Sequence, residues 1–231
     1  MPQNSRFIIS LGGSLIVPDE VDVEFLAGFK TVIEDAVKKR EHFLIITGGG
    51  RTSRKYSEAA KKLRCLNPDD LDWLGIHSTR LNGHLLRTIF RAHAHPRIIT
   101  NPNHKEPASE PIVIASGYRP GWSTDYVAVL LAKKYGVKTI LNLSNIDYVY
   151  DKDPKKFPDA SPIKNISWSD FRKIVGNKWD PGANLPFDPV ASKLAEKLNL
   201  RVMIMNGKKL NNLKNALFGK PFLGTVISSP R

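Results

Sequence analysis

The sequence predicts an α/β protein, a three-layer αβα sandwich with a largely parallel central sheet. Short apolar runs that do not alternate with polar residues, as in strands covered on both faces, recur along the chain. Stretches with a helical spacing of apolar residues separate these runs. Because a helix that connects two strands returns the chain to the same end of the sheet, this alternation favours parallel pairing.

The first 135 residues show the alternation clearly. Apolar residues three or four positions apart mark the first helix, namely Val23, Leu26, Phe29, Ile33 and Val37. The expected strands cover residues 7–11, 43–47, 97–99 and 112–115. The expected helices cover residues 22–40, 51–63, 69–93 and 126–135.

The rest of the chain continues this pattern with one irregular interruption. The expected strands are 138–143, 201–205 and 223–227, and the expected helices are 169–175, 188–198 and 210–217. The stretch 155–187 is rich in Pro, Lys, Asn and Trp, so we expect loops there, with the short helix and a small hairpin near 163–166. We expect a single domain, residues 1–231, with an N-terminal lobe of about residues 1–135 and a C-terminal lobe of about residues 136–231.

The composition is that of an ordinary globular chain. Of the 231 residues, 41% are hydrophobic and 25% are charged, and no apolar run approaches the roughly 20 residues that span a bilayer. Cys65 is the single cysteine, so no internal disulfide and no site of several cysteine ligands can form. Because the first residues contain no apolar signal segment either, we expect a cytoplasmic protein without a membrane partner.

The formal net charge of +13 favours anionic partners, such as phosphorylated small molecules or polyanions. A solvated surface rich in lysine is the alternative, and the scatter of the basic residues along the chain supports it in part. The sequence has no arginine-rich arm and no basic run interleaved with aromatic residues. We therefore do not expect nucleic-acid binding.

Two glycine turns point most directly to a chemistry. The turn 12–14 (Gly-Gly-Ser) follows the first expected strand, and the turn 48–50 (Gly-Gly-Gly) follows the second and opens a helix. Backbone N–H groups in such turns can surround an anion, because glycine has no side chain and a helix N-terminus carries partial positive charge. Ligands of parallel sheets bind beyond the carboxyl ends of the strands. The loops that we expect to converge on that edge are 12–14, 48–54, 117–125 and 144–153.

Six motifs occur in an order that resembles a known family. They are Leu-Gly-Gly-Ser at 11–14, Gly-Gly-Gly-x-x-x-Arg-Lys-Tyr at 48–56, Asp-Trp-Leu-Gly-Ile at 72–76, Pro-Gly-x-Ser-Thr-Asp at 120–125, Ser-Asn-Ile-Asp-x-Val-Tyr-x-x-Asp-Pro at 144–154 and Asp-Pro-x-Ala-x-Lys at 188–193. With them the chain resembles the amino acid kinase superfamily and, within it, the archaeal-type uridylate (UMP) kinases. The resemblance covers nearly the whole chain and implies an amino acid kinase-like fold.

The resemblance implies that ATP phosphorylates UMP to UDP, with Mg²⁺ bound to the ATP phosphates. It also implies that the N-terminal lobe binds the acceptor and the C-terminal lobe binds ATP. A phosphate monoester is mostly a dianion at pH 7, so the acceptor needs no general base, and the sequence shows no Ser/His/Asp or Cys/His arrangement. We see no carboxylate cage for a metal, so phosphates and water are expected to supply most ligands of Mg²⁺.

The family motifs imply roles for individual residues. The implied catalytic residues are Lys193, Arg54 and Gly12. The implied ATP-binding residues are Gly13, Ser14, Gly50, Arg54, Ser144, Asn145, Tyr150 and Asp153. The implied UMP-binding residues are Gly49, Asp72, Gly117, Tyr118, Arg119, Pro120, Gly121, Trp122, Ser123 and Thr124.

Several of these side chains also have an ordinary structural interpretation. Arg54 and Lys193 are compatible with solvated positions on helices, and Tyr150 with a packing aromatic residue. Asp72 precedes an apolar run, where a carboxylate can simply cap a helix. Asp188 can orient Lys193 or only cap the helix that carries it.

Three positions depart from the family pattern. Ser10 stands where many superfamily members have Lys, although the archaeal-type uridylate kinases lack that Lys as well. Trp122 stands where a smaller polar residue or His is commoner, and Tyr148 replaces a frequent Gly. The remaining alternatives are another phosphate or carboxylate acceptor, and a protein that stores or senses nucleotide without turnover. From the resemblance we expect a homo-oligomer, a hexamer built as a trimer of dimers.

Overall fold

A mixed sheet with a parallel centre organises the molecule. The computed structural model describes residues 5–104, 107–178 and 185–230, and within these ranges the main sheet has the order β3-β2-β1-β4-β8-β9-β7. Strands β3, β2, β1, β4 and β8 are parallel, whereas β9 is antiparallel to β8 and parallel to β7. This confirms the predicted α/β class. The strands are β1 (Ser5–Leu11), β2 (His42–Thr47), β3 (Ile112–Ala115), β4 (Thr139–Ser144), β7 (Asn165–Ser167), β8 (Arg201–Asn206) and β9 (Thr225–Ser228).

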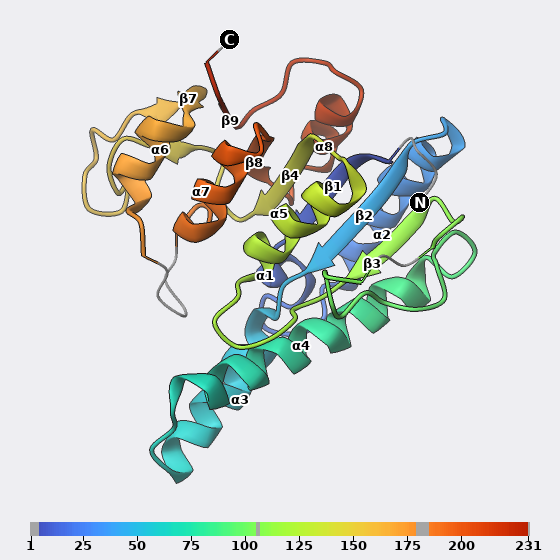
Figure 1. The fold of residues 1–231 in the computed structure, drawn as a ribbon, viewed down its shortest axis with the longest axis vertical. Helices are drawn as coiled ribbons and strands as arrows, with labels where there is room; N and C mark the ends of the chain where they lie inside the picture. Colours follow the sequence, from blue (N-terminus) through green and yellow to red (C-terminus); the bar gives the residue numbers. More distant parts are fainter. Residues whose placement is uncertain (1–4, 105–106, 179–184, 231) are drawn as a thin grey trace.

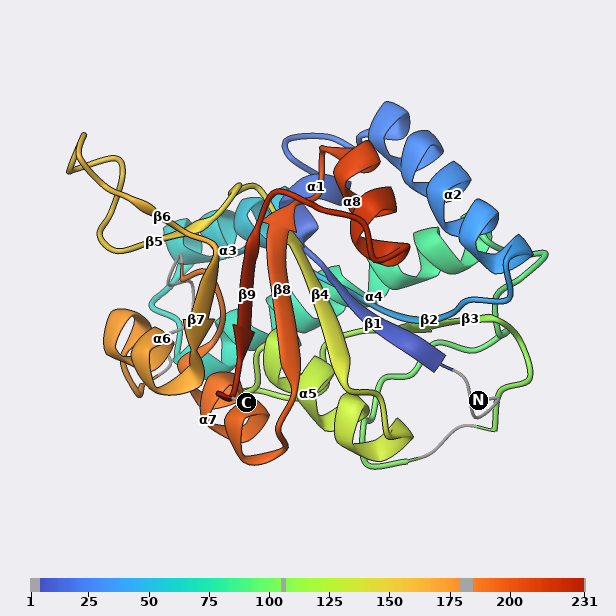
Figure 2. The same cartoon turned by 90° about the horizontal axis from the view of Figure 1, so that it is seen from above.

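Helices cover both faces of the sheet (Figure 2). Successive strand residues point into two separate cores, with Ile8 and Ile140 in one and Ile9 and Leu141 in the other. The predicted three-layer αβα sandwich is confirmed. The first core contains α5 (Thr124–Tyr135), α6 (Trp168–Val175) and α7 (Pro189–Lys197), and the second contains α1 (Gly13–Ile16), α2 (Val23–Lys38), α4 (Pro68–Ile89) and α8 (Leu210–Leu217).

Two helices extend beyond the sandwich as an arm (Figure 1). No residue of α3 (Gly50–Leu63) is buried, and the first half of α4 runs beside it away from the sheet. The start of α4 is well defined, because the Asn67 side chain accepts the Asp70 N–H at 2.7 Å and Pro68 is the first helical residue. Within the described ranges, no helix combines the length and the apolar character that crossing a bilayer requires.

Two local predictions were wrong because strand partners lie far away in sequence. The strand expected at 97–99 is reduced to an isolated bridge between Ile99 and Ala115. The hairpin expected near 163–166 does not form: β6 (Pro162–Ile163) pairs with β5 (Val149–Tyr150) in a separate two-stranded sheet, and β7 joins β9. In addition, the helix expected over 69–93 ends at Ile89, and the short helix α1 was not predicted.

A buried threonine holds the two-stranded sheet against the main sheet. The Thr225 hydroxyl donates to the Ile163 carbonyl at 2.5 Å and accepts the Val149 N–H at 2.8 Å. Thr225 pairs with Ile204 on β8, toward the carboxyl end of that strand. The segment that follows β4 is therefore held at the edge where the parallel strands end.

Candidate active site

The turns after β1 and β2 are in backbone contact. A β-carbon placed on Gly13 would lie 2.0 Å from the Gly50 nitrogen, and one placed on Gly48 would lie 2.4 Å from the Gly13 nitrogen. Gly50 also has a φ of +64°, which favours glycine over residues with a side chain. The expected convergence of loops 12–14 and 48–54 is therefore confirmed. Between them, the two turns present backbone N–H groups at the carboxyl ends of adjacent strands.

The loop after β4 meets the first glycine turn only at its start. The Gly12 N–H donates to the Leu143 carbonyl at 2.8 Å, and a β-carbon on Gly12 would lie 3.6 Å from the Ser144 α-carbon. Asn145 follows and is exposed. Tyr150 lies half-buried in β5 and Asp153 is exposed beyond it, and within the described ranges no recorded contact joins either residue to a glycine turn.

Helix α4 holds the loop that follows β3. The Gly117 N–H donates to the Thr79 hydroxyl at 2.8 Å, and the Gly121 N–H donates to the Asp72 carboxylate at 2.7 Å. The Arg80 guanidinium donates to the Tyr118 carbonyl at 3.2 Å. Asp72 therefore lies inside α4, in contact with the loop, and the alternative that it caps the helix is wrong.

The same loop carries an aromatic cluster. The Trp122 ring lies edge-on to the rings of Tyr118 and Tyr126, with centroids 5.4 Å and 4.9 Å away. The Arg119 guanidinium stacks over the Trp122 ring at 4.4 Å. The cluster is a group of edge-on rings with the Arg119 cation over the Trp122 ring, next to Pro120 and Gly121 in the turn.

Arg54 and Lys193 are exposed, and within the described part of the chain neither makes a recorded ion pair. Arg54 lies in the first turns of α3, directly after the second glycine turn. Lys193 lies on α7, whose first N–H groups are capped by Asp188. Asp188 thus has the predicted capping role, and it also accepts a hydrogen bond from the Ser123 hydroxyl, which links α7 to α5. Ser123 in turn caps α5, and Thr124 is the first residue of that helix.

Similarity to known proteins identifies the family to which this fold and site belong. The sequence pattern of the amino acid kinase family matches residues 5–206 of the chain. The chain belongs to the amino acid kinase family.

Relatives over most of the chain agree with that assignment. Uridylate kinase from Thermoplasma volcanium is 34% identical over 230 residues, which are 97% of this chain and 98% of that protein. Uridylate kinase from Sulfolobus acidocaldarius is 35% identical over 214 residues, with 90% and 93% coverage. The crystal structure of uridylate kinase from Archaeoglobus fulgidus matches with a TM-score of 0.83 at 29% identity, covering 96% of this chain and all 100% of that one.

In this member of the amino acid kinase family, a carboxyl group that was not among the predicted site residues bonds to β1 two residues before Gly12. Asp125 accepts a hydrogen bond from the Ser10 hydroxyl at 3.0 Å and from the Asp188 N–H at 3.2 Å. Burial of the carboxyl, followed by the nearby charge of Asp188, raises the pKa of Asp125 to about 7. Asp125 belongs to the motif at 120–125, but the sequence alone does not reveal that it meets residues 115 and 63 positions away.

We predict that Asp125→Asn makes the protein more stable at pH 8 but not at pH 4. The pKa of Asp125 lies above its usual value of 3.8, so the folded protein keeps a proton that the unfolded chain has released. Wild-type stability therefore falls as the pH rises from about 4 to about 7. The asparagine amide carries no charge and can bond both the Ser10 hydroxyl and the Asp188 N–H. The variant should therefore lack the loss of stability that wild type shows between pH 4 and pH 7, which is on the order of a few kcal/mol.

Urea unfolding of both proteins between pH 4 and pH 8 measures this difference. Asp170→Asn is the control, because Lys173 and Ser167 hold the pKa of Asp170 below its usual range. The difference between that variant and wild type should stay nearly constant from pH 5 to pH 8, because the carboxylate of Asp170 is ionised in both the folded and the unfolded chain over this range. A constant difference between wild type and Asp125→Asn across the range would contradict the raised pKa.

Proposed function

We propose that this protein transfers the γ-phosphoryl group of ATP to the phosphate of UMP and releases ADP and UDP. The observation that carries the proposal is the backbone contact between the two glycine turns, because it places two anion-binding turns side by side. Curated relatives at 34% and 35% identity over most of the chain are named uridylate kinases. The acceptor loop, residues 117–124 after β3, is held by α4 and then provides a second binding surface.

Positioning and charge neutralisation account for the reaction. An oxygen of the UMP phosphate attacks the γ-phosphorus of ATP, a P–O bond forms, and the bond to the oxygen bridging the β- and γ-phosphorus breaks as ADP leaves. The attacking oxygen is already anionic, so no base must remove a proton. The glycine-turn N–H groups hold the phosphates in line, and the cations of Arg54 and Lys193 reduce the negative charge where the two substrates meet.

We assign the substrates to the two lobes as the family resemblance implies. The acceptor lobe is residues 1–135, with Gly49, Asp72 and loop 117–124 around UMP. The ATP lobe is residues 136–231, and its Ser144, Asn145, Tyr150 and Asp153 would hold the adenosine half. Gly12, Gly13, Ser14 and Gly50 lie at the boundary, where the turns after β1 and β2 touch, and they would hold the ATP phosphates.

Mg²⁺ enters with ATP as part of the substrate. Within the described residues, no three His, Cys, Asp or Glu side chains are grouped as a metal site. Asp125 and Asp188 already accept hydrogen bonds from Ser10, Ser123 and the first N–H groups of α7. Phosphate oxygens and water would therefore supply most of the ligands, as is usual for Mg²⁺, and the ion would neutralise charge on the donor.

A panel of acceptors tests the function. The rate of ADP release should be highest with UMP and lower with CMP, AMP and small carboxylic acids, because Asp72 and loop 117–124 would contact the nucleoside. No preference for UMP would reject the acceptor assignment and favour another phosphate or carboxylate acceptor. Tight ATP binding in calorimetry without any UDP at high enzyme concentration would instead favour a nucleotide-storing or nucleotide-sensing protein.

We predict that Arg54→Ala lowers kcat/KM for UMP at least about tenfold, the usual scale for one charged contact to a transferring phosphoryl group. Arg51→Ala is a matched control on the same helix turn, because Arg51 is already engaged with Asp19 and Glu58. The control should stay within about twofold of wild type. Equal effects of the two substitutions in steady-state kinetics would remove Arg54 from the site.

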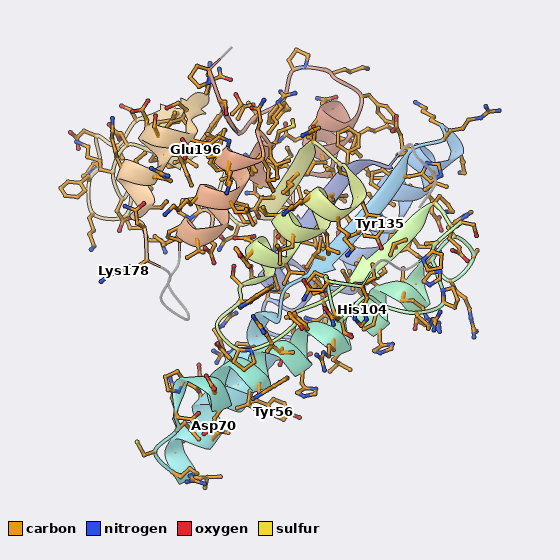
Figure 3. All side chains as sticks on the ribbon, in the orientation of Figure 1. Tyr56, Asp70, His104, Tyr135, Lys178 and Glu196 are labelled. Atoms are coloured by element: carbon orange, nitrogen blue, oxygen red, sulfur yellow. The ribbon has the colours of Figure 1, made fainter. Side chains whose placement is uncertain are left out.

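We also propose a cytoplasmic homo-oligomer, a hexamer built from dimers. Large apolar side chains are exposed on α3 and α4, with Leu63 at the end of α3 86% exposed and Leu81 in the second half of α4 62% exposed. Tyr56 and Asp70 mark the arm in Figure 3. Light scattering should therefore give the mass of six chains of 25.8 kDa each, and Leu81→Asp should reduce that mass. A monomeric wild type would contradict the proposal.

A further inference from the structure

One buried amide of α4 contacts the second glycine turn directly. Asn82 is only 2% exposed, and its Nδ2 donates to the Gly48 carbonyl at 2.8 Å and to the Gly49 carbonyl at 3.3 Å. Both partners are acceptors, so the group that faces them must be a donor. Neither the motifs nor the resemblance pointed to this residue.

The two hydrogen bonds determine where the next two N–H groups point. In a planar trans peptide unit, the carbonyl of one residue and the N–H of the following residue face opposite ways. Because Asn82 draws the carbonyls of Gly48 and Gly49 toward α4, the N–H groups of Gly49 and Gly50 are directed away from it. Within the described part of the chain, neither N–H donates to a protein acceptor.

Other hydrogen bonds of the turn involve its two ends. The Gly48 N–H donates to the Leu11 carbonyl at 2.9 Å, and the Arg51 N–H donates to the Val17 carbonyl at 2.9 Å. These bonds hold the beginning and the end of the turn. Between them, glycine permits many backbone angles and has no strong preference of its own. The Gly13 backbone and the first turn of α3 pack against or follow this part of the turn, and Asn82 adds the hydrogen bonds that draw the Gly48 and Gly49 carbonyls toward α4.

Asn82 can have this effect because α4 is itself held against β2. The Thr47 hydroxyl at the end of β2 donates to the Thr79 carbonyl at 2.8 Å, one helical turn before Asn82. The Thr79 hydroxyl also accepts the Gly117 N–H of the acceptor loop. A side chain on a fixed helix can hold a flexible turn in one geometry.

We propose that Asn82 is a positioning residue for phosphoryl transfer, which orients the peptide units of Gly48–Gly50 so that two N–H groups face the phosphates. This inference rests on the proposed function. Asn82 does not touch the substrates and acts only through the turn. It would be required as an amide, because aspartate has the same shape but offers no donor when ionised.

The test compares Asn82→Asp and Asn82→Ala with Asn212→Ala in the full-length enzyme. Asn212 is a matched control, because it is 8% exposed and bonds the backbone of Leu223 in both directions at 2.7 Å, away from the glycine turns. Both Asn82 variants should lose at least about tenfold in kcat/KM for UMP well below their melting temperatures. Asn212→Ala should lose stability while its kinetics stay within about twofold of wild type.

A second measurement separates positioning from a general loss of structure. Calorimetry with UMP and with uridine should show weaker binding of UMP to both Asn82 variants and unchanged binding of uridine, which carries no phosphate. Equal losses for the two ligands, wild-type kinetics in a folded variant, or failure of both variants to fold would overturn the proposal. If wild type instead phosphorylates another acceptor, the proposed function fails, and the same comparison with that acceptor and its phosphate-free form still decides the role of Asn82.

Discussion

The site depends on a steric constraint: two backbone turns from adjacent parallel strands touch each other. A single methyl group at Gly13 or Gly50 would lie 2.0 Å or 2.3 Å from backbone atoms of the other turn, so side chains are excluded at the contact. The two turns therefore meet through backbone atoms alone, and the backbone offers N–H groups at fixed spacing. Two phosphate-bearing substrates can meet at such a surface because each turn has donors of its own.

The parallel sheet makes this contact possible, and α4 gives it a definite shape. β1 lies between β2 and β4, so the three loops that follow these strands emerge next to one another. α4 then reaches the loops after β2 and β3 through buried polar side chains, among them Asn82 and Thr79. The helix thus connects the loop after β2 with the loop after β3, while its first half extends outward in the arm (Figure 1).

Charge is distributed unevenly around the turns. The chain has a formal net charge of +13. Nevertheless, the residue that bonds to Ser10, just before the first glycine turn, is an acid: the carboxyl of Asp125 also accepts the backbone N–H of Asp188. No cation of the described residues is recorded as paired with Asp125, and its raised pKa reflects that environment. The cations of Arg54 and Lys193 face solvent on two different helices, α3 and α7.

The sequence by itself determined the α/β class, the strands β1, β2, β3, β4, β8 and β9 of the main sheet, the helices α2 to α8, and the glycine turns. These features depend on local periodicity and on the conformational freedom of glycine, which can be read within a few residues. Likewise, Asp188 was recognisable as a candidate helix cap, because a cap acts within one turn of its helix.

Only the tertiary structure decided which distant residues meet. The pairing of β5 with β6, the contact of Asp72 with Gly121, and the cluster of Ser10, Asp125 and Asp188 join residues between 12 and 115 positions apart. Asn82 gave no signal, because a buried asparagine in a helix looks like any other polar residue until its partners are known. Such contacts arise from the packing of whole helices against the sheet, and no local pattern records them.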